Sequence, residues 1–179
     1  MLDSEQDQPG QKGQADPVSV ARNIILRHLN LAPKSRFQLA QVLEKKGIPQ
    51  EAAQVALDRL AEVGLIDDLA YAHLLVRSRC ASKRISKTLL IRELRQKGIC
   101  DEFIEVSLAE LTPDDEYQMA RDLAAKKLRS MSGLSKEVVL RRVVGLLARK
   151  GYPHAVAYKV LQNLELDTQD LTRGEYHLG

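Results

Sequence analysis

The 179-residue sequence predicts an all-α protein made of three tandem three-helix repeats in an elongated, curved arrangement. A lysine–glycine pair recurs at nearly constant spacing, and the hydrophobic residues around each pair follow the periodicity of a helix. No stretch combines strand-like alternation with hairpin turn residues, so we expect no sheet. Repeats that stack in a row contact mainly their neighbours, which predicts the elongated body.

The repeat is anchored at Gly47, Gly98 and Gly151, which lie 51 and 53 residues apart. Each glycine follows a lysine, a leucine lies four residues before it, and further leucines lie ten and thirteen residues after it. The positive charge of a lysine in the last turn interacts favourably with the helix dipole, and glycine adopts the left-handed conformation that stops a helix. Each anchor therefore predicts the end of one helix, a short turn and a second helix with a buried face.

Polar residues mark where helices begin. Ser35, Ser86 and Ser135 are candidate N-caps for the helix that ends at each glycine. A further helix precedes each pair, and Asp67 and Thr112 are start signals for the second and third of these. The further helices are expected at Val18–Leu31, Asp68–Ala81 and Pro113–Arg129.

These elements divide the chain into three repeats between polar ends. The repeats are expected at residues 18–64, 65–111 and 112–164, between flexible tails at 1–17 and 165–179. Each tail carries an excess of carboxylates and few apolar residues, a composition that is typical of frayed ends.

The composition excludes several classes of protein. There is no apolar stretch long enough to span a membrane and no apolar signal segment, so we expect a cytoplasmic protein. Cys80 and Cys100 have neither a CxxC spacing nor a nearby histidine, which indicates reduced thiols rather than a disulfide or a zinc site. No phosphate-binding or zinc-protease motif occurs, so we expect no cofactor, no metal, no catalytic residue and no enzymatic activity.

Charge alternates strongly along the chain. Residues 73–97 hold eight cations and one carboxylate, residues 101–119 hold seven carboxylates and no cation, and residues 120–150 hold nine cations and two carboxylates. A solvated helix surface is one interpretation. An anionic partner, either a nucleic acid backbone or an acidic protein groove, is the other. The candidate partner-binding residues are Arg77, Arg79, Lys83, Arg84, Lys87, Arg92, Arg95, Lys126, Lys127, Arg129, Arg141 and Arg142.

Three short motifs carry a resemblance to a known family. They are GLIDDLAYA at residues 64–72, Arg77-Ser78-Arg79, and LIRELRQKGI at residues 90–99. Together they resemble the central signature of the RecX family of RecA-regulatory proteins, and the likeness extends over residues 18–164. One departure is Ser86, where family members often have glycine, but serine serves equally well there as an N-cap.

The resemblance implies three tandem three-helix repeats and a non-enzymatic modulator of recombination and DNA repair. Such a protein binds RecA and its nucleoprotein filament, and it inhibits RecA ATP hydrolysis, strand exchange and coprotease activity. We expect a monomer with RecA and the RecA–DNA filament as partners, direct contact with DNA phosphates, and no membrane. Two alternatives stay open: a stand-alone, sequence-independent DNA-binding protein, and a helical-repeat scaffold for another acidic protein.

Overall fold

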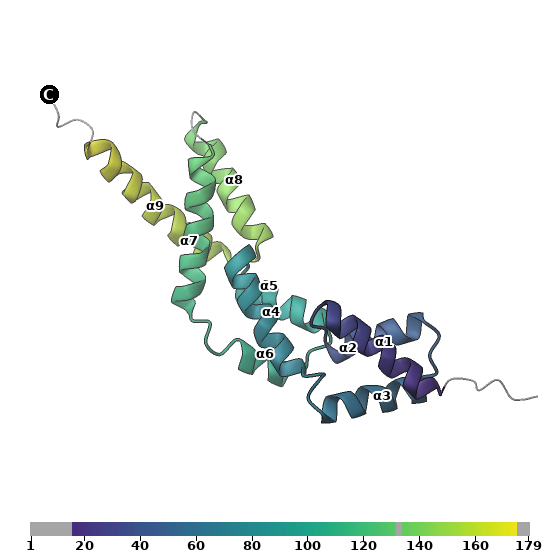
Figure 1. The fold of residues 1–179 in the computed structure, drawn as a ribbon. Helices are drawn as coiled ribbons and strands as arrows, with labels where there is room; N and C mark the ends of the chain where they lie inside the picture. Colours follow the sequence, from purple (N-terminus) through teal and green to yellow (C-terminus); the bar gives the residue numbers. More distant parts are fainter. Residues whose placement is uncertain (1–15, 132–133, 175–179) are drawn as a thin grey trace, which may run out of the picture. The chain divides into compact units, whose positions relative to one another are not determined.

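The computed structural model describes residues 16–131 and 134–174, with side chains described as far as Leu164. The described residues form nine helices and no strand (Figure 1), which confirms the all-α prediction. The chain divides into two compact units, one ending at Asp67 and one beginning at Asp68. The elongated, curved arrangement stays a prediction.

The first unit is a single three-helix repeat. It consists of α1 (Pro17–Leu31), α2 (Arg36–Lys45) and α3 (Gln50–Glu62). Ile25, Leu39 and Leu43 lie at the centre of its core with no exposed surface. Ser35 caps α2 as predicted: its hydroxyl accepts from the Gln38 amide, and the Gln38 side chain accepts from the Ser35 amide.

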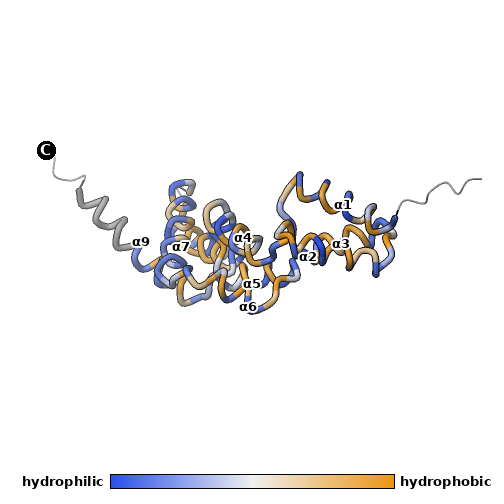
Figure 2. The backbone as a smooth tube through the Cα atoms, turned by 60° about the horizontal axis from the view of Figure 1, so that its bottom comes forward, coloured by the Kyte–Doolittle hydropathy of each residue, from blue (hydrophilic) through white to orange (hydrophobic). Residues whose placement is uncertain are grey.

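The second unit contains the other two repeats, each with its own hydrophobic core. The second repeat has α4 (Asp68–Lys83), α5 (Lys87–Gln96) and α6 (Asp101–Ser107) around Leu90 and Leu94. The third has α7 (Pro113–Arg129), α8 (Lys136–Arg149) and α9 (His154–Gly174) around Val143 and Leu147. Hydrophobic and hydrophilic stretches alternate along each helix, as amphipathic packing requires (Figure 2).

The repeated glycines end the second helix of each repeat in the predicted left-handed conformation. Their φ angles are 71° at Gly47, 75° at Gly98 and 84° at Gly151. In each case the amide after the glycine donates to the carbonyl of the leucine four residues before the glycine, over 3.1, 3.2 and 3.0 Å. This is the Schellman motif, in which those two side chains also pack together. It explains why the leucine and the apolar residue after the glycine recur with it.

The structure also departs from the sequence predictions at a few places. Helix α9 continues to Gly174, inside the segment 165–179 that was expected to be a flexible tail. The expected tail at residues 1–15 lies outside the described residues. Ser135 is the N-cap of α8, but its side chain makes no capping hydrogen bond. Among the described residues, no helix is both long and apolar enough to cross a membrane.

Candidate functional site: a cationic groove in the second unit

A contact between two turns joins the second and third repeats within the second unit. The turn between α4 and α5 contains Arg84, the only described non-glycine residue with a positive φ, at 45°. The Arg84 carbonyl accepts a 2.8 Å hydrogen bond from the hydroxyl of Tyr152, and the Lys83 carbonyl accepts one of 2.9 Å from the ammonium of Lys150. The Ser86 amide donates to the Lys150 carbonyl over 3.0 Å. The turn between α8 and α9 therefore holds the start of α5.

Gly151 allows this approach because it has no side chain. A Cβ atom at Gly151 would lie 2.5 Å from Oγ of Ser86 and 2.9 Å from Cβ of Leu89, both closer than real Cβ contacts. Ser86 is fully buried, and its hydroxyl accepts from the Leu89 amide that begins α5. Gly151 thus combines a helix stop with a close approach between two repeats.

Acidic residues of α7 complete the contact. The Glu116 carboxylate accepts a 2.9 Å hydrogen bond from the Lys87 amide, and Asp122 lies 3.5 Å from the Arg84 guanidinium. Burial, and after it the nearby Glu116 carboxylate, raises the pKa of Tyr152, so its hydroxyl stays a hydrogen-bond donor throughout the physiological range. These contacts make the second and third repeats one body.

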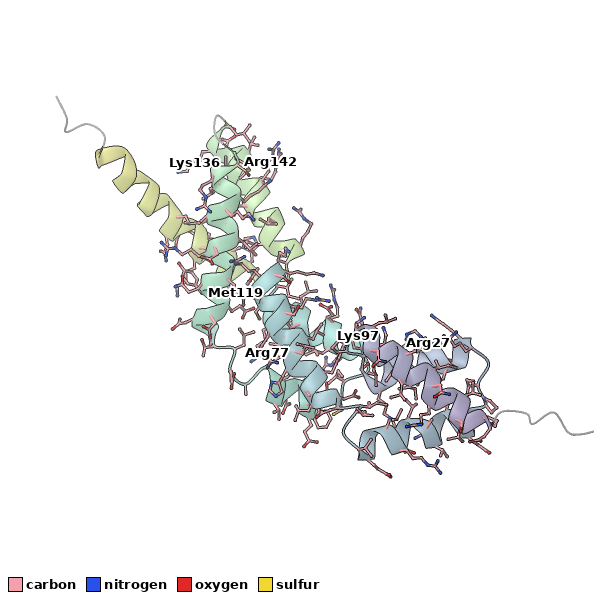
Figure 3. The ribbon with its side chains drawn as sticks, in the orientation of Figure 1. Arg27, Arg77, Lys97, Met119, Lys136 and Arg142 are labelled. Atoms are coloured by element: carbon pink, nitrogen blue, oxygen red, sulfur yellow. The ribbon has the colours of Figure 1, made fainter. Side chains whose placement is uncertain are left out.

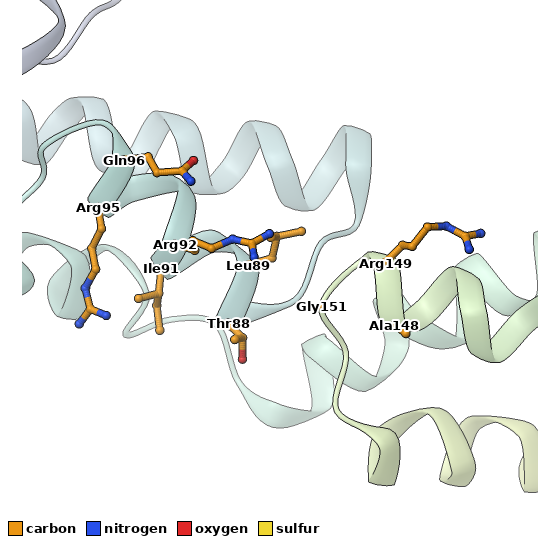
Figure 4. A pocket seen from close by; sticks show the side chains of 9 residues that line it. All are labelled: Thr88, Leu89, Ile91, Arg92, Arg95, Gln96, Ala148, Arg149 and Gly151. Atoms are coloured by element: carbon orange, nitrogen blue, oxygen red, sulfur yellow. The ribbon is translucent and has the colours of Figure 1, made fainter.

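Beside this contact, α5 and the end of α8 enclose a groove of about 750 Å³ (Figure 4). Its apolar lining comes from Leu89, Ile91, Ala148 and Gly151, and its polar lining from Thr88 and Gln96. Three cations also line it, Arg92 and Arg95 from α5 and Arg149 from α8. Arg92 extends from α5 toward the end of α8 that carries Ala148 and Arg149.

Three of the predicted partner-binding cations are already paired inside the fold. Arg79 makes three contacts of 2.6–2.9 Å with the Glu93 carboxylate, and both side chains are about three-quarters buried. The hydrogen bonds from Arg79 lower the pKa of Glu93. Arg95 pairs with Asp101 over 2.9 Å, and Arg84 pairs with Asp122. Substituting Arg79 would break its pair with Glu93, so a variant that tests partner binding should leave Arg79 unchanged.

The other nine predicted cations are exposed or half-buried. No hydrogen bond or ion pair of their side chains is present within the described residues. They are Arg77, Lys83, Lys87, Arg92, Lys126, Lys127, Arg129, Arg141 and Arg142. Figure 3 shows Arg77 on α4 and Arg142 on α8 at separate places in the second unit, so the predicted residues do not form one patch.

Sequence reasoning missed three polar or charged residues of the groove. Arg149 was counted in the basic segment 120–150 but was not singled out, although it directly precedes the Lys150-Gly151 anchor. Thr88 and Gln96 gave no signal, because a single threonine or glutamine on an amphipathic helix is ordinary. The groove depends on a contact between residues more than fifty positions apart, which local patterns do not reveal.

The third helices of the first two repeats carry acidic rather than basic surfaces. In helix-turn-helix proteins this helix enters the major groove of DNA. Here α6 exposes Asp101, Glu102 and Glu105, and α3 exposes three carboxylates, Glu51, Asp58 and Glu62, with one cation, Arg59. Carboxylates at these positions repel phosphates, so the first two repeats are poorly suited to that mode of binding. The part of α9 whose side chains are described, His154 to Leu164, holds no carboxylate and does not share this feature.

Comparisons with known proteins agree over all three repeats. Models of the first, second and third three-helix domains of RecX match residues 21–60, 67–108 and 114–161. "Regulatory protein RecX" of Streptomyces coelicolor is 45% identical over 165 residues, which cover 92% of this chain and 86% of the relative. The protein of that name from Thermobifida fusca is 36% identical over 160 residues, covering 89% and 86%.

Solved structures agree on the fold. A crystal structure of regulatory protein RecX has a TM-score of 0.71 at 26% identity and covers 83% of this chain and 73% of that chain. The crystal structure of RecX from Lactobacillus salivarius has a TM-score of 0.73 at 24% identity and covers 85% and 99%. Both support the three tandem three-helix repeats that the glycine anchors predict.

Proposed function

Because this chain belongs to the RecX family of regulatory proteins, we propose that it binds RecA and its nucleoprotein filament and inhibits RecA ATP hydrolysis, strand exchange and coprotease activity. It acts in the cytoplasm, by binding rather than by catalysis. The second repeat gives the main structural support. Its neighbouring cations are paired inside the fold, whereas Arg77, Lys83 and Arg92 remain exposed and without an ion pair among the described residues.

A rigid body with exposed cations explains how binding inhibits ATP hydrolysis by RecA. The contact between the turns at Arg84 and Tyr152 holds the second and third repeats in one orientation. A body of that kind, bound across neighbouring filament subunits, resists the subunit motions that accompany ATP turnover. Arg141 and Arg142 of α8 form a separate group of exposed cations in the third repeat and are available for contact with DNA phosphates.

The deciding experiment is a titration of the RecA ATPase on single-stranded DNA. We expect inhibition that grows with added protein. If inhibition is complete at far less than one molecule of this protein per RecA subunit, the protein caps filament ends. If inhibition saturates near one molecule per RecA subunit, the protein coats the filament along its length. Binding is measured in parallel to naked single-stranded DNA, to free RecA and to the assembled filament. Equal affinity for DNA with and without RecA contradicts the proposal and favours a stand-alone DNA-binding protein.

Charge reversal locates the contact surface. The variant Arg77→Glu, Lys83→Glu, Arg92→Glu removes exposed cations without an ion pair among the described residues, so it is expected to fold normally. It should lose most of its inhibition of the RecA ATPase. Circular dichroism and thermal unfolding confirm that the variant is folded. Full inhibition by the folded variant would move the contact surface away from the second repeat.

A further inference from the structure

We infer that the groove between α5 and α8 binds a segment of the protein partner in which carboxylates alternate with apolar side chains. This inference rests on the proposed function and names the part of the partner that the second unit recognises. According to this inference, the groove binds a protein segment and not a nucleic acid strand.

The lining of the groove combines the two kinds of surface that such a segment needs. Leu89, Ile91, Ala148 and Gly151 supply apolar surface, whose burial against apolar side chains is favourable. Arg92 and Arg149 are exposed and make no hydrogen bond or ion pair within the described residues. Figure 4 shows Arg92 extending toward the end of α8 and Arg149 extending from that end away from α5, so the two guanidiniums are available to bind partner carboxylates within the groove and at its edge.

The third cation of the groove has a different role. Arg95 is paired with Asp101 over 2.9 Å, and the Asp101 side chain is itself 69% exposed. The Asp101 carboxylate balances the charge of Arg95, so Arg95 adds no net positive charge to the groove. The number of partner carboxylates that the groove accepts is therefore small.

Nucleic acid fits this surface poorly. A nucleic acid strand carries a phosphate at every nucleotide, so a strand lying in the groove would bring phosphates near the carboxylate of Asp101, which pairs with the groove residue Arg95. Single-stranded nucleic acid also gains much of its affinity from stacking on aromatic rings, and the groove residues include none. The apolar lining would remain unused. A short peptide with only a few carboxylates can place them at Arg92 and Arg149 and pack its apolar side chains against the apolar lining.

The first repeat provides an internal comparison. The first two repeats are 51 residues apart, so four residues of α2 occupy the positions that correspond to Thr88, Ile91, Arg92 and Arg95. These residues, Phe37, Ala40, Gln41 and Glu44, also line a hollow, of about 400 Å³. None of the residues of that hollow is a cation. The same helix face thus forms a recess in both repeats, and only the second repeat adds arginines to it.

The test uses overlapping 15-residue peptides that cover the RecA sequence of the same organism, together with a 15-nucleotide oligothymidylate. Binding is measured with the full-length protein, with Arg92→Gln, Arg149→Gln, and with the control Arg22→Gln, Arg27→Gln, whose two arginines are exposed on α1 and are not among the predicted partner-binding residues. Both variants lose two exposed cations, but only the first loses them from the groove. Thermal unfolding confirms that both are folded.

We expect the full-length protein to select peptides in which carboxylates flank apolar residues. The groove variant should bind them at least about tenfold more weakly, and the control variant within about threefold of the parent. Three results would overturn the inference: no bound peptide, bound peptides without carboxylates, or equal losses in the two variants. A groove variant that loses oligothymidylate binding more than peptide binding would also overturn it, because the groove would then be a phosphate site.

The ATPase titration separates this inference from the proposed function. If the full-length protein inhibits RecA and the groove variant inhibits equally well, the groove inference fails and the proposed function stands. If the full-length protein neither binds RecA nor inhibits it, the proposed function itself fails, and with it the inference.

Discussion

Replacing Gly151 by alanine tests the contact between the second and third repeats. Alanine at a φ of 84° costs about 1 kcal/mol, because its Cβ crowds the backbone in the left-handed region. The new Cβ would also lie 2.5 Å from the buried Ser86 hydroxyl and 2.9 Å from Leu89 Cβ. Neither atom is the far end of a flexible side chain, so the two turns must separate, at a further cost of about 1–3 kcal/mol. The expected total is about 2–4 kcal/mol.

Gly47 supplies the matched control for this substitution. It occupies the same position in the first repeat and has a φ of 71°, but no atom lies within 4 Å of the place where a Cβ would be. Gly47→Ala should therefore cost only the backbone part, about 1 kcal/mol. The difference between the two variants measures the close approach of the repeats.

Hydrogen exchange is the suitable assay, because a chain with two compact units need not unfold in one step. Gly151→Ala should speed exchange at residues 84–90 as well as at 150–157, since both turns lose their contact. Gly47→Ala should affect the first unit alone. Equal destabilisation by the two substitutions, or undisturbed exchange at residues 84–90, would refute the reasoning.

Three further predictions follow from single sites. Leu94→Asp places an unpaired charge at a fully buried position and should unfold the second repeat, at a cost of about 4 kcal/mol or more, seen as lost helical circular dichroism. Arg79→Gln should cost about 1 kcal/mol at pH 7 in urea unfolding. Its Glu93 partner has a lowered pKa in the folded protein, so the pair stabilises the fold above the pKa that this carboxyl has in the unfolded chain. This stabilisation is lost as pH falls through the folded pKa. If the variant and the parent still differ in the free energy of unfolding by the same amount in acid, this prediction is contradicted. Gly145→Ala, inside α8, should raise the free energy of unfolding, measured by urea denaturation, by up to about 1 kcal/mol, because its Cβ meets only the movable guanidinium of Arg149 at 3.3 Å.

The sequence predicted the local features of the fold well. The helix Pro113–Arg129 has the predicted bounds, and Thr112 caps it with Asp115 in a reciprocal hydrogen-bonded pair. The glycine stops at the ends of α2, α5 and α8 are also confirmed. These features depend on residues a few positions apart, and their signals therefore lie within short stretches of sequence.

The candidate site was predicted only in part, because it depends on distant contacts. The basic segments identified Arg92 as a candidate, but they could not reveal that Arg79 is held by Glu93, 14 residues away. They also gave no reason to join Arg149 to α5. A count of charges finds the helices that carry cations, whereas the pairing of those cations is decided by packing.

The turn at Arg84 has a consequence for how this protein tolerates truncation. Two of its carbonyls take their hydrogen bonds from Lys150 and Tyr152, residues of the following repeat. A chain truncated so that it ends before residue 134 lacks Lys150 and Tyr152. The two carbonyls then lose their hydrogen-bond donors, and the buried Ser86 becomes exposed to water. The last two repeats therefore depend on each other in folding, and removing the third disturbs the second.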